Sequence, residues 1–371
     1  MTVTAQEVRH QSSVHSLSAM AERLAQVKCS YNTRRIDKSA IRVLLDGDVR
    51  PVPGDLLLAR ITRLGHHKRI ELEQGRRAPL FVGDEVMVCY GHRYAPDQFE
   101  AEVPSDLREC HLVAAGGIAS LCLSLHDSAR SPTLIQPLGL LGDLQGRPIN
   151  LSDWALVPAV CQRPRPFVAV VVGTAMNAGK TTSAAHLIKG LSRSGLKVGA
   201  AKLTGTGAGG DRWLMKDAGA VEVVDFTDAG FVSTYHASIT EIEEIQAKLI
   251  NHLRNKGVEA IVLEIADGLF QKETAALLES ARLRANIDVV IFAANDAMGA
   301  CGGAEWLIQR NLPLVAISGC VSSSPLAARE ASMATGLTVL GLEALAAPDI
   351  AVTLFERCAD WVANSTSAKV G

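Results

Sequence analysis

A short segment near the middle of the chain restricts the fold more than any other feature of the sequence. The apolar run 167–172 (FVAVVV) leads directly into the glycine-rich segment 173–181, which reads GTAMNAGKT, and a helix-like stretch follows. The segment ends in the G-K-T of a phosphate-binding loop (P-loop), with five residues between its two glycines where the commonest pattern has four. In such a unit the loop N–H groups and the helix N-terminus together attract phosphate. The sequence therefore predicts a strand–loop–helix unit that binds a phosphate-bearing ligand.

This loop supplies most of the predicted binding residues. Lys180 is expected to reach the terminal phosphates of a nucleotide, and the Thr181 hydroxyl is expected to ligate Mg²⁺. The predicted cofactor-binding residues are Gly173, Thr174, Asn177, Ala178, Gly179, Lys180, Thr181 and Thr182.

Continuous apolar runs recur on both sides of the loop and alternate with helix-like stretches. Runs of this kind are typical of parallel strands that are covered on both faces. The expected strands are 167–172, 197–201, 221–226, 260–265, 288–293, 313–318 and 338–341, with helices over 181–193 and 239–255. We predict an α/β fold of three layers, the P-loop NTPase fold with a mostly parallel sheet, over residues 161–371.

The region before the linker-like segment 161–167 has a different pattern. Residues 1–36 are expected to be a helical or flexible lead-in, and 37–160 a smaller β-rich domain, either a barrel or a sandwich. Apolar alternation in LLLARITRL and EVMVCY, with turn residues at regular intervals, is the basis of that prediction. A chain of 371 residues is long enough for two such domains.

Two acids and a second glycine-rich loop are expected at the same edge of the sheet. The run 260–265 contains Glu264 at its end and Asp267 follows, where an acid beside a P-loop holds Mg²⁺ and its waters. Thr181, Glu264 and Asp267 are therefore the predicted metal residues. Lys202 and Arg212 flank a loop with four glycines in six residues, which we expect to be mobile. Together with Lys180, they are the predicted catalytic residues. A flexible surface loop without a catalytic role explains their positions equally well.

Composition excludes several classes of partner. Lys and Arg number 37 against 39 Asp and Glu, a balance that gives no general attraction to nucleic acid or to anionic membranes. A basic excess over 34–80 has no aromatic residues among it, so nucleic acid is not expected as a partner. No apolar run reaches membrane-spanning length, and the eight scattered cysteines suit a reducing compartment. We expect a cytoplasmic protein that acts on a small molecule, as a homo-oligomer, in the simplest case a dimer.

The motifs also resemble known families. VVVGTAMNAGKTT, AAKLTGTGAGGDRWLMKDAGA and VLEIADG together resemble the dethiobiotin synthetase and cobyrinic acid amidating group of P-loop proteins. They are similar as well to the guanine-nucleotide-binding P-loop protein of molybdenum cofactor biosynthesis. A further similarity is to the C-terminal P-loop domain of a family long labelled as of unknown function (DUF1611), one branch of which is described as D-glutamate N-acetyltransferase. The resemblance covers about residues 165–345 and rests on the G-T-x-x-x-x-G-K-T loop, Lys202, Thr204 and Glu264.

Three functions follow from the residues and the resemblance. The first is an enzyme that uses ATP and Mg²⁺ to phosphorylate or ligate a small carboxylate. The second is an N-acyltransferase whose P-loop holds the phosphates of coenzyme A. The third is a nucleotide-binding accessory protein of cofactor biosynthesis. We rank the ATP-dependent ligase or kinase first; substrate identity and base preference lie beyond the sequence.

Overall fold

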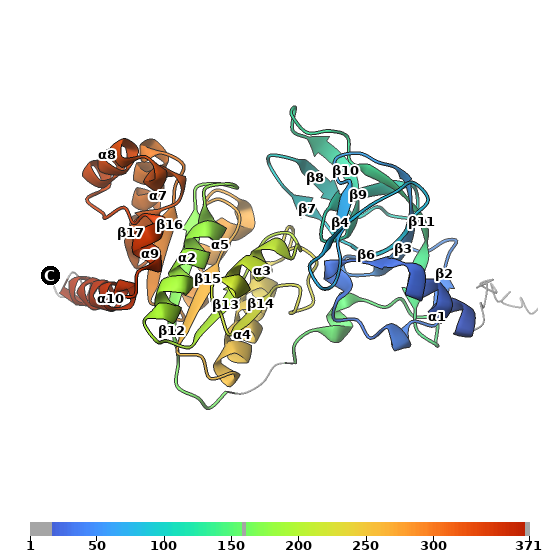
Figure 1. Cartoon of the computed structure of the whole chain (residues 1–371), viewed down its shortest axis with the longest axis horizontal. Coiled ribbons are helices and arrows are strands. Elements are labelled where there is room, and N and C mark those ends of the chain that lie inside the picture. The colour runs from blue at the N-terminus through green and yellow to red at the C-terminus, as the bar shows by residue number, and fades with distance from the viewer. Residues whose placement is uncertain (1–16, 158–160, 368–371) are drawn as a thin grey trace, which may run out of the picture.

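A computed structural model describes residues 17–157 and 161–367, in which two regions lie side by side (Figure 1). The N-terminal region is rich in strands, and the C-terminal region alternates strands with helices. The lead-in predicted for residues 1–36 is described only from residue 17 onward.

The C-terminal region is built on a six-stranded sheet in the order β14-β13-β15-β12-β16-β17. Every pairing in it is parallel. The strands are β12 (Phe167–Gly173), β13 (Val198–Lys202), β14 (Glu222–Asp225), β15 (Ala260–Glu264), β16 (Val289–Ala293) and β17 (Leu314–Ser318). Six of the seven expected strands are thus confirmed. The seventh, 338–341, is wrong as a strand, because only an isolated bridge joins Val339 to Ile317.

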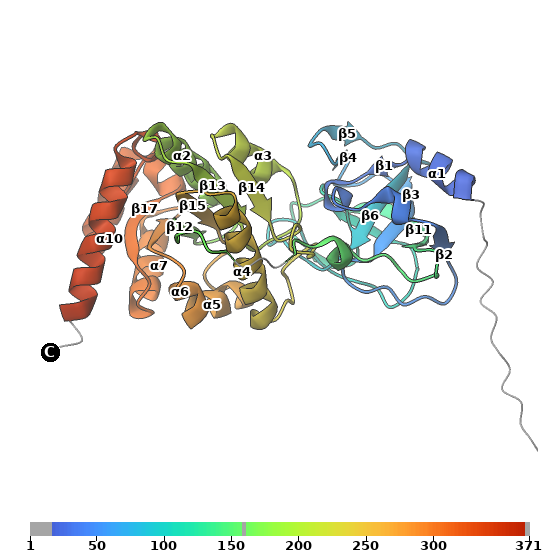
Figure 2. The same cartoon turned by 90° about the horizontal axis from the view of Figure 1, so that it is seen from below.

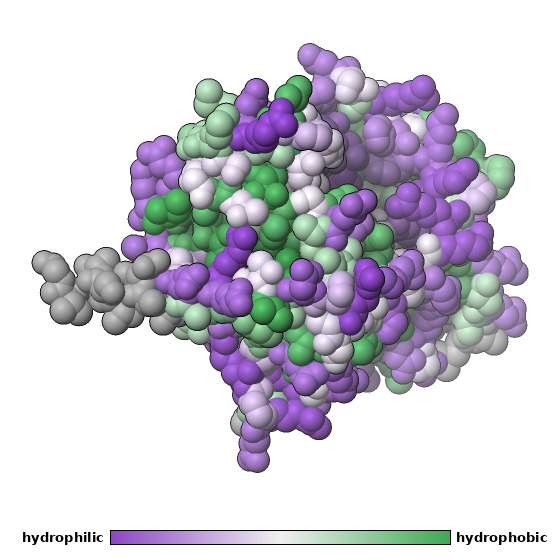
Figure 3. Space-filling model, turned by 60° about the vertical axis from the view of Figure 1, so that its left-hand side comes forward, coloured by the Kyte–Doolittle hydropathy of each residue, from purple (hydrophilic) through white to green (hydrophobic). Residues whose placement is uncertain are grey.

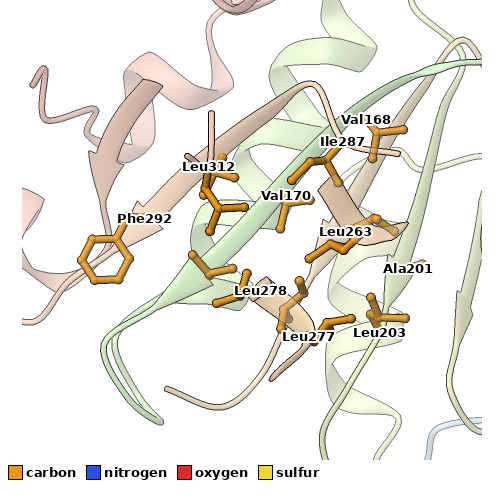
Figure 4. Close-up of a cluster of buried hydrophobic side chains, with 14 of the residues drawn as sticks. Val168, Val170, Ala201, Leu203, Leu263, Leu277, Leu278, Ile287, Phe292 and Leu312 are labelled. Carbon is orange, nitrogen blue, oxygen red and sulfur yellow. The ribbon is translucent and has the colours of Figure 1, made fainter. Parts of the chain in front are cut away.

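Helices cover both faces of this sheet, as the continuous apolar strands require (Figure 2). They are α2 (Lys180–Arg193), α3 (Gly210–Asp217), α4 (Ile239–Asn255), α5 (Lys272–Glu279), α6 (Ala281–Arg284), α7 (Ala297–Gln309), α8 (Pro325–Thr335), α9 (Leu342–Ala346) and α10 (Ile350–Ser367). One buried cluster joins the sheet to α4–α8 and contains Val170, Leu263 and Leu277 (Figure 4). A second cluster joins the other face to α2, α3, α9 and α10. The three-layer α/β prediction is confirmed.

The N-terminal region, the β-domain, contains a nine-stranded sheet whose pairings close on themselves. Five strands form the ring: β6 pairs with β3, β3 with β11, β11 with β9, β9 with β10, and β10 again with β6. Its elements are α1 (Leu17–Gln26), β1 (Lys28–Cys29), β2 (Val43–Leu45), β3 (Leu56–Arg63), β6 (Glu85–Tyr90), β7 (Arg93–Tyr94), β8 (Phe99–Glu102), β9 (Cys110–Ala114), β10 (Ile118–Leu125) and β11 (Thr133–Gly142), with the separate hairpin β4 (Arg69–Glu71) and β5 (Arg77–Pro79).

Two details of this domain differ from the sequence-based expectation. Residues 28–36 are part of the domain, since β1 pairs with β6 and Tyr31, Asn32 and Thr33 are fully buried. The first four residues of β3 are all buried, because both faces of the strand are covered there. Simple alternation therefore holds only toward the end of that strand.

One face of the molecule gathers apolar side chains. Figure 3 shows them on the side where α7–α10 lie, surrounded by hydrophilic side chains. Exposed apolar residues of these helices include Met298, Leu326 and Met333. The homodimer expected from the sequence stays a prediction. Within residues 17–157 and 161–367, no helix combines the length and the apolar character needed to cross a membrane.

Candidate functional site: the P-loop edge of the sheet

The P-loop connects the central strand β12 to helix α2. β12 lies between β15 and β16, so the loop leaves the sheet at its middle, at the carboxyl ends of the strands. Parallel α/β sheets bind their ligands at this edge. The next strands deliver polar side chains to the same edge, because Lys202 of β13 is in register with Glu264 of β15.

The conformation of the P-loop depends on its glycines and on contacts with neighbouring loops. Gly179 has φ +90°, and a Cβ on it would lie 3.0 Å from the Cα of Gly319. The Cys320 N–H donates to the Ala178 carbonyl at 3.1 Å, and the Thr174 N–H donates to the Ala293 carbonyl at 3.0 Å. The loop is thus held on two sides by the strand ends of β16 and β17.

Lys180, the first residue of α2, is folded back over the loop. Its Nζ donates to the Ala175 carbonyl at 2.7 Å, and the residue is 6% exposed. Burial lowers the pKa of the Lys180 ammonium, and the carboxylates of Glu264 and Asp267 act against that decrease. A cation held in this way faces the space where the loop N–H groups would bind phosphate.

Glu264 provides the strongest indication of a cation site. It is 1% exposed, and its Oε1 accepts a hydrogen bond from the Thr181 hydroxyl at 3.0 Å. Its Oε2 is buried and has no hydrogen-bond partner among the residues that the structure describes. Burial raises the pKa of this carboxyl, whereas the neighbouring ammonium of Lys202, 3.6 Å from Oε1, acts to lower it. A hydroxyl beside a buried, half-satisfied carboxylate is a donor set that fits Mg²⁺ with phosphate and water as its other ligands.

These groups line a cavity of about 450 Å³. Its predicted members are Asn177, Gly179, Lys180, Thr181, Thr182, Lys202, Glu264 and Asp267. Burial raises the pKa of Asp267, which Lys180 and Lys202 oppose. The structure therefore brings five of the eight predicted P-loop residues, both predicted acids and one of the two loop cations around a single space, whereas Gly173, Thr174 and Ala178 are not in its lining.

The remaining predicted residues lie differently. Arg212 is absent from the lining and forms an ion pair with Asp228, 2.9 Å between nitrogen and oxygen. Thr174 lies within the P-loop, and its buried hydroxyl has no hydrogen-bond partner in the described part of the chain. The segment between Lys202 and Arg212, expected to be a mobile loop, contacts the β-domain, and α3 begins within it at Gly210. Its glycines permit this close approach of another part of the chain, and its mobility stays a prediction.

Two residues at this site are not among the predicted site residues. Asp211, whose charge in the glycine-rich loop suggests a contact with substrate, forms an ion pair with Lys202 inside the cavity. Asp97 of the β-domain accepts a hydrogen bond from the Asn177 amide of the P-loop at 3.0 Å. Eighty positions separate these two residues. No local pattern connects them, so only the fold could reveal the contact.

Fold and site together define a P-loop α/β domain. No protein-family model matches the sequence, and the curated proteins contain no match. The likeness to the dethiobiotin synthetase group and to the DUF1611 family therefore stays a prediction.

Three solved structures illustrate what the chain is similar to. The 54 kDa protein of the signal recognition particle from Aeropyrum pernix K1, in complex with GDP, matches with 21% identity and a TM-score of 0.35 over 57% of this chain. The receptor FtsY from Elizabethkingia anophelis, in complex with GDP, matches with 14% identity and a TM-score of 0.33 over 50%. FtsY from Thermotoga maritima matches with 15% identity and a TM-score of 0.34 over 51%.

The match covers 52%, 59% and 66% of those three chains, respectively. The present chain thus spans about half the length of the first of them. At such low identities and TM-scores, the likeness says nothing about the reaction of this chain.

Proposed function

We propose that this protein is an enzyme that binds ATP with Mg²⁺ at the P-loop edge and phosphorylates or ligates a small carboxylate. The observation that supports this most is the contact between Thr181 and Glu264 beside Lys180. It combines a hydroxyl and a free carboxylate oxygen for a cation with a buried ammonium for phosphate. Phosphoryl transfer requires these elements, because its catalysis consists mainly of positioning and charge stabilisation.

The residues divide between holding the nucleotide and stabilising charge. The backbone of 173–179 and the Lys180 ammonium would bind the β- and γ-phosphates. Thr181 and Glu264 would hold Mg²⁺, which when bound neutralises negative charge on the phosphates. The Lys202 ammonium lines the same cavity. It would bind the acceptor carboxylate, which the negative charge of the phosphates would otherwise repel.

The phosphoryl transfer itself requires only ATP and the acceptor carboxylate. An oxygen of the acceptor carboxylate attacks the γ-phosphorus, and the bond to the bridging oxygen of ADP breaks. The products are ADP and an acyl phosphate. In a ligase, an amine then attacks the acyl carbon, loses a proton to water and expels phosphate.

Thermal denaturation with different ligands tests the proposal. ATP, GTP and acetyl-CoA would each be added with and without Mg²⁺ to the wild type and to Lys180→Ala. A ligand at a hundred times its Kd adds about 2.7 kcal/mol of stability. The proposal expects stabilisation by ATP that depends on Mg²⁺ and disappears in Lys180→Ala. Stabilisation by acetyl-CoA alone, indifferent to Mg²⁺, would contradict it and favour the acyltransferase instead.

Release of ADP then separates an enzyme from an accessory protein. A panel of small carboxylates would be supplied with ATP and Mg²⁺, and ADP release measured with each. Release that rises with one member of the panel supports the ligase or kinase. Tight nucleotide binding with slow release, whatever the acceptor, would indicate an accessory role.

A further inference from the structure

The loop between β13 and α3 is held by the β-domain. The Asn32 amide donates to the Gly207 carbonyl at 3.3 Å, and the Gly209 N–H donates to the Glu71 carboxylate at 2.6 Å. The ring of Tyr31 lies so close to Gly209 that a Cβ there would be 2.9 Å from Cδ2. Asn32 and Tyr31 are fully buried, and Glu71 is 1% exposed. Together with hydrogen bonds inside the C-terminal region, such as that from the Gly207 N–H to the Val232 carbonyl at 2.9 Å, these contacts hold a backbone whose glycines permit many conformations.

A buried charge network continues from the same segment of the β-domain. The Tyr31 hydroxyl donates to Asp225 at 2.5 Å, and Arg34 donates to the Thr227 hydroxyl at 2.6 Å. Arg34 also forms an ion pair with Asp228 at 2.6 Å. Burial alone would lower the pKa of Arg34, but Asp225 and Asp228 raise it above its ordinary value. The network is therefore charged, and it ties the β-domain to the end of β14.

The first turn of α3 connects this network to the nucleotide site. Arg212 reaches Asp228, whereas the preceding residue, Asp211, reaches Lys202 in the cavity. Lys202 is also 3.6 Å from Glu264. Two consecutive residues thus join the contacts of the β-domain to the ammonium that faces the predicted cation site.

From these contacts we infer that Tyr31, Asn32, Arg34 and Glu71 of the β-domain are positioning residues for Lys202. They act through the loop 203–209 and Asp211, which fix the Lys202 ammonium beside Glu264. The β-domain is therefore an integral part of the nucleotide site. The consequence for catalysis rests on the proposed function, whereas the positioning itself does not.

The inference predicts the chemical reactivity of one lysine. The Lys202 ammonium is paired with Asp211 and lies 3.6 Å from Glu264, so it reacts slowly with amine-directed reagents, because it must leave both carboxylates before it can react. Two variants remove contacts of the β-domain at separate points. Arg34→Met removes those in the charge network, and Asn32→Ala removes the hydrogen bond to the loop. Both are expected to increase labelling of Lys202 several-fold, measured by mass spectrometry and normalised to the exposed Lys189.

Matched variants separate positioning from general loosening. Glu102→Gln weakens another contact between the two regions, the one between Glu102 and His236 at 3.1 Å. It is expected to leave Lys202 at the wild-type level. Arg34→Lys, which keeps the charge, should return the labelling toward the wild type. If Arg34→Met or Asn32→Ala fails to fold by circular dichroism, the other decides the result.

ADP release provides the second measurement. With ATP and Mg²⁺, Arg34→Met and Asn32→Ala should lower the rate constant on the order of tenfold, because a small misplacement of a catalytic group is costly. The Kd for ATP should change by no more than about twofold, since the P-loop contacts remain. A purely structural role would lower the amount of folded protein and leave both quantities per folded molecule unchanged.

The outcomes distinguish the two proposals. If wild-type labelling of Lys202 persists in folded Arg34→Met and Asn32→Ala, or if Glu102→Gln raises it equally, the positioning inference is wrong. If the wild type neither binds nor cleaves ATP, the proposed function fails. The labelling result still decides the positioning in that case.

Discussion

The P-loop and the glycine-rich loop after β13 lie at the same edge of one sheet, but they are held in different ways. The P-loop (173–179) is held mainly within its own domain, by the strand before it, the helix after it and the ends of β16 and β17, with one contact to Asp97 of the β-domain. The loop 203–209 also has contacts within its own domain, such as the Gly207 N–H donating to the Val232 carbonyl, but buried side chains of the β-domain hold it as well. Both loops contain several glycines, so glycine content does not determine what holds a loop. What determines it is which part of the chain occupies the space that the glycines leave.

The difference also divides the site by function. Lys180 and Thr181 have their hydrogen bonds within the C-terminal region, to the Ala175 carbonyl and to Glu264. Lys202 depends on Asp211, whose helix begins under contacts from the β-domain. Changes in the β-domain are therefore expected to affect the second cation of the site and to spare the first.

The largest expected effect concerns the network that holds the second loop. Asp225→Asn removes a buried charge partner of Arg34, which should cost about 3–5 kcal/mol of unfolding free energy near neutral pH. Burial opposes ionisation of Asp225, but Arg34 and hydrogen bonds from Thr227 and Tyr31 hold its pKa below the ordinary value.

The sign of the pH dependence follows from that lowered pKa. Such a carboxylate stabilises the fold above its unfolded pKa of about 3.9, and the contribution disappears as the pH falls through the lower folded value. The difference between wild type and Asp225→Asn should thus be complete near neutral pH and shrink below about pH 4. Urea unfolding across this range measures it, and a constant difference would contradict the role of Asp225.

The next effect concerns the locally held loop. Lys180→Ala removes a charge-assisted contact to phosphate, which should weaken ATP binding about a hundredfold. Lys189→Ala, on an exposed position of the same helix, should leave the affinity unchanged. Calorimetric titration of both variants measures this. Equal affinities for the two would mean that the P-loop is not the nucleotide site.

A smaller effect tests how tightly the two regions meet. A Cβ on Gly116 of the β-domain would lie 2.0 Å from the Gly207 carbonyl. Gly116→Ala should therefore push the second loop away and cost about 1–3 kcal/mol of stability. Thermal denaturation gives the loss, and increased labelling of Lys202 should accompany it. A variant with wild-type stability and labelling would show that this contact is loose.

The smallest effect provides a reference value for glycine substitutions and concerns the C-terminal region. Gly302 lies in α7 at an exposed position, with open space where a Cβ would be. Gly302→Ala should stabilise the protein by about 0.5–1 kcal/mol, because alanine favours the helix. Its neighbour provides the contrast, since a Cβ on Gly303 would meet Phe292 at 2.0 Å. If both alanine variants change the melting temperature equally, the packing around α7 is not as described.

Much of the C-terminal fold could be predicted, because its signals are local. The apolar runs of β12 and β15 and the one-sided helix α2 each contain their own evidence in consecutive residues. The positions of Lys180, Thr181 and Glu264 follow, since parallel strands end at one edge. The contacts of Asp97, Glu71 and Tyr31 could not be predicted in this way. Their partners are 80, 138 and 194 positions away, and no periodicity extends across such distances.

Binding of ATP with and without Mg²⁺ to the wild type and to Glu264→Gln tests the central claim most directly. Calorimetric titration would give the affinity in all four cases. The structure predicts that Mg²⁺ tightens ATP binding in the wild type, and that Glu264→Gln loses this gain while retaining the Mg²⁺-free affinity. The same gain from Mg²⁺ in both proteins, or no ATP binding by the wild type, would contradict the assignment of this edge as a nucleotide and Mg²⁺ site.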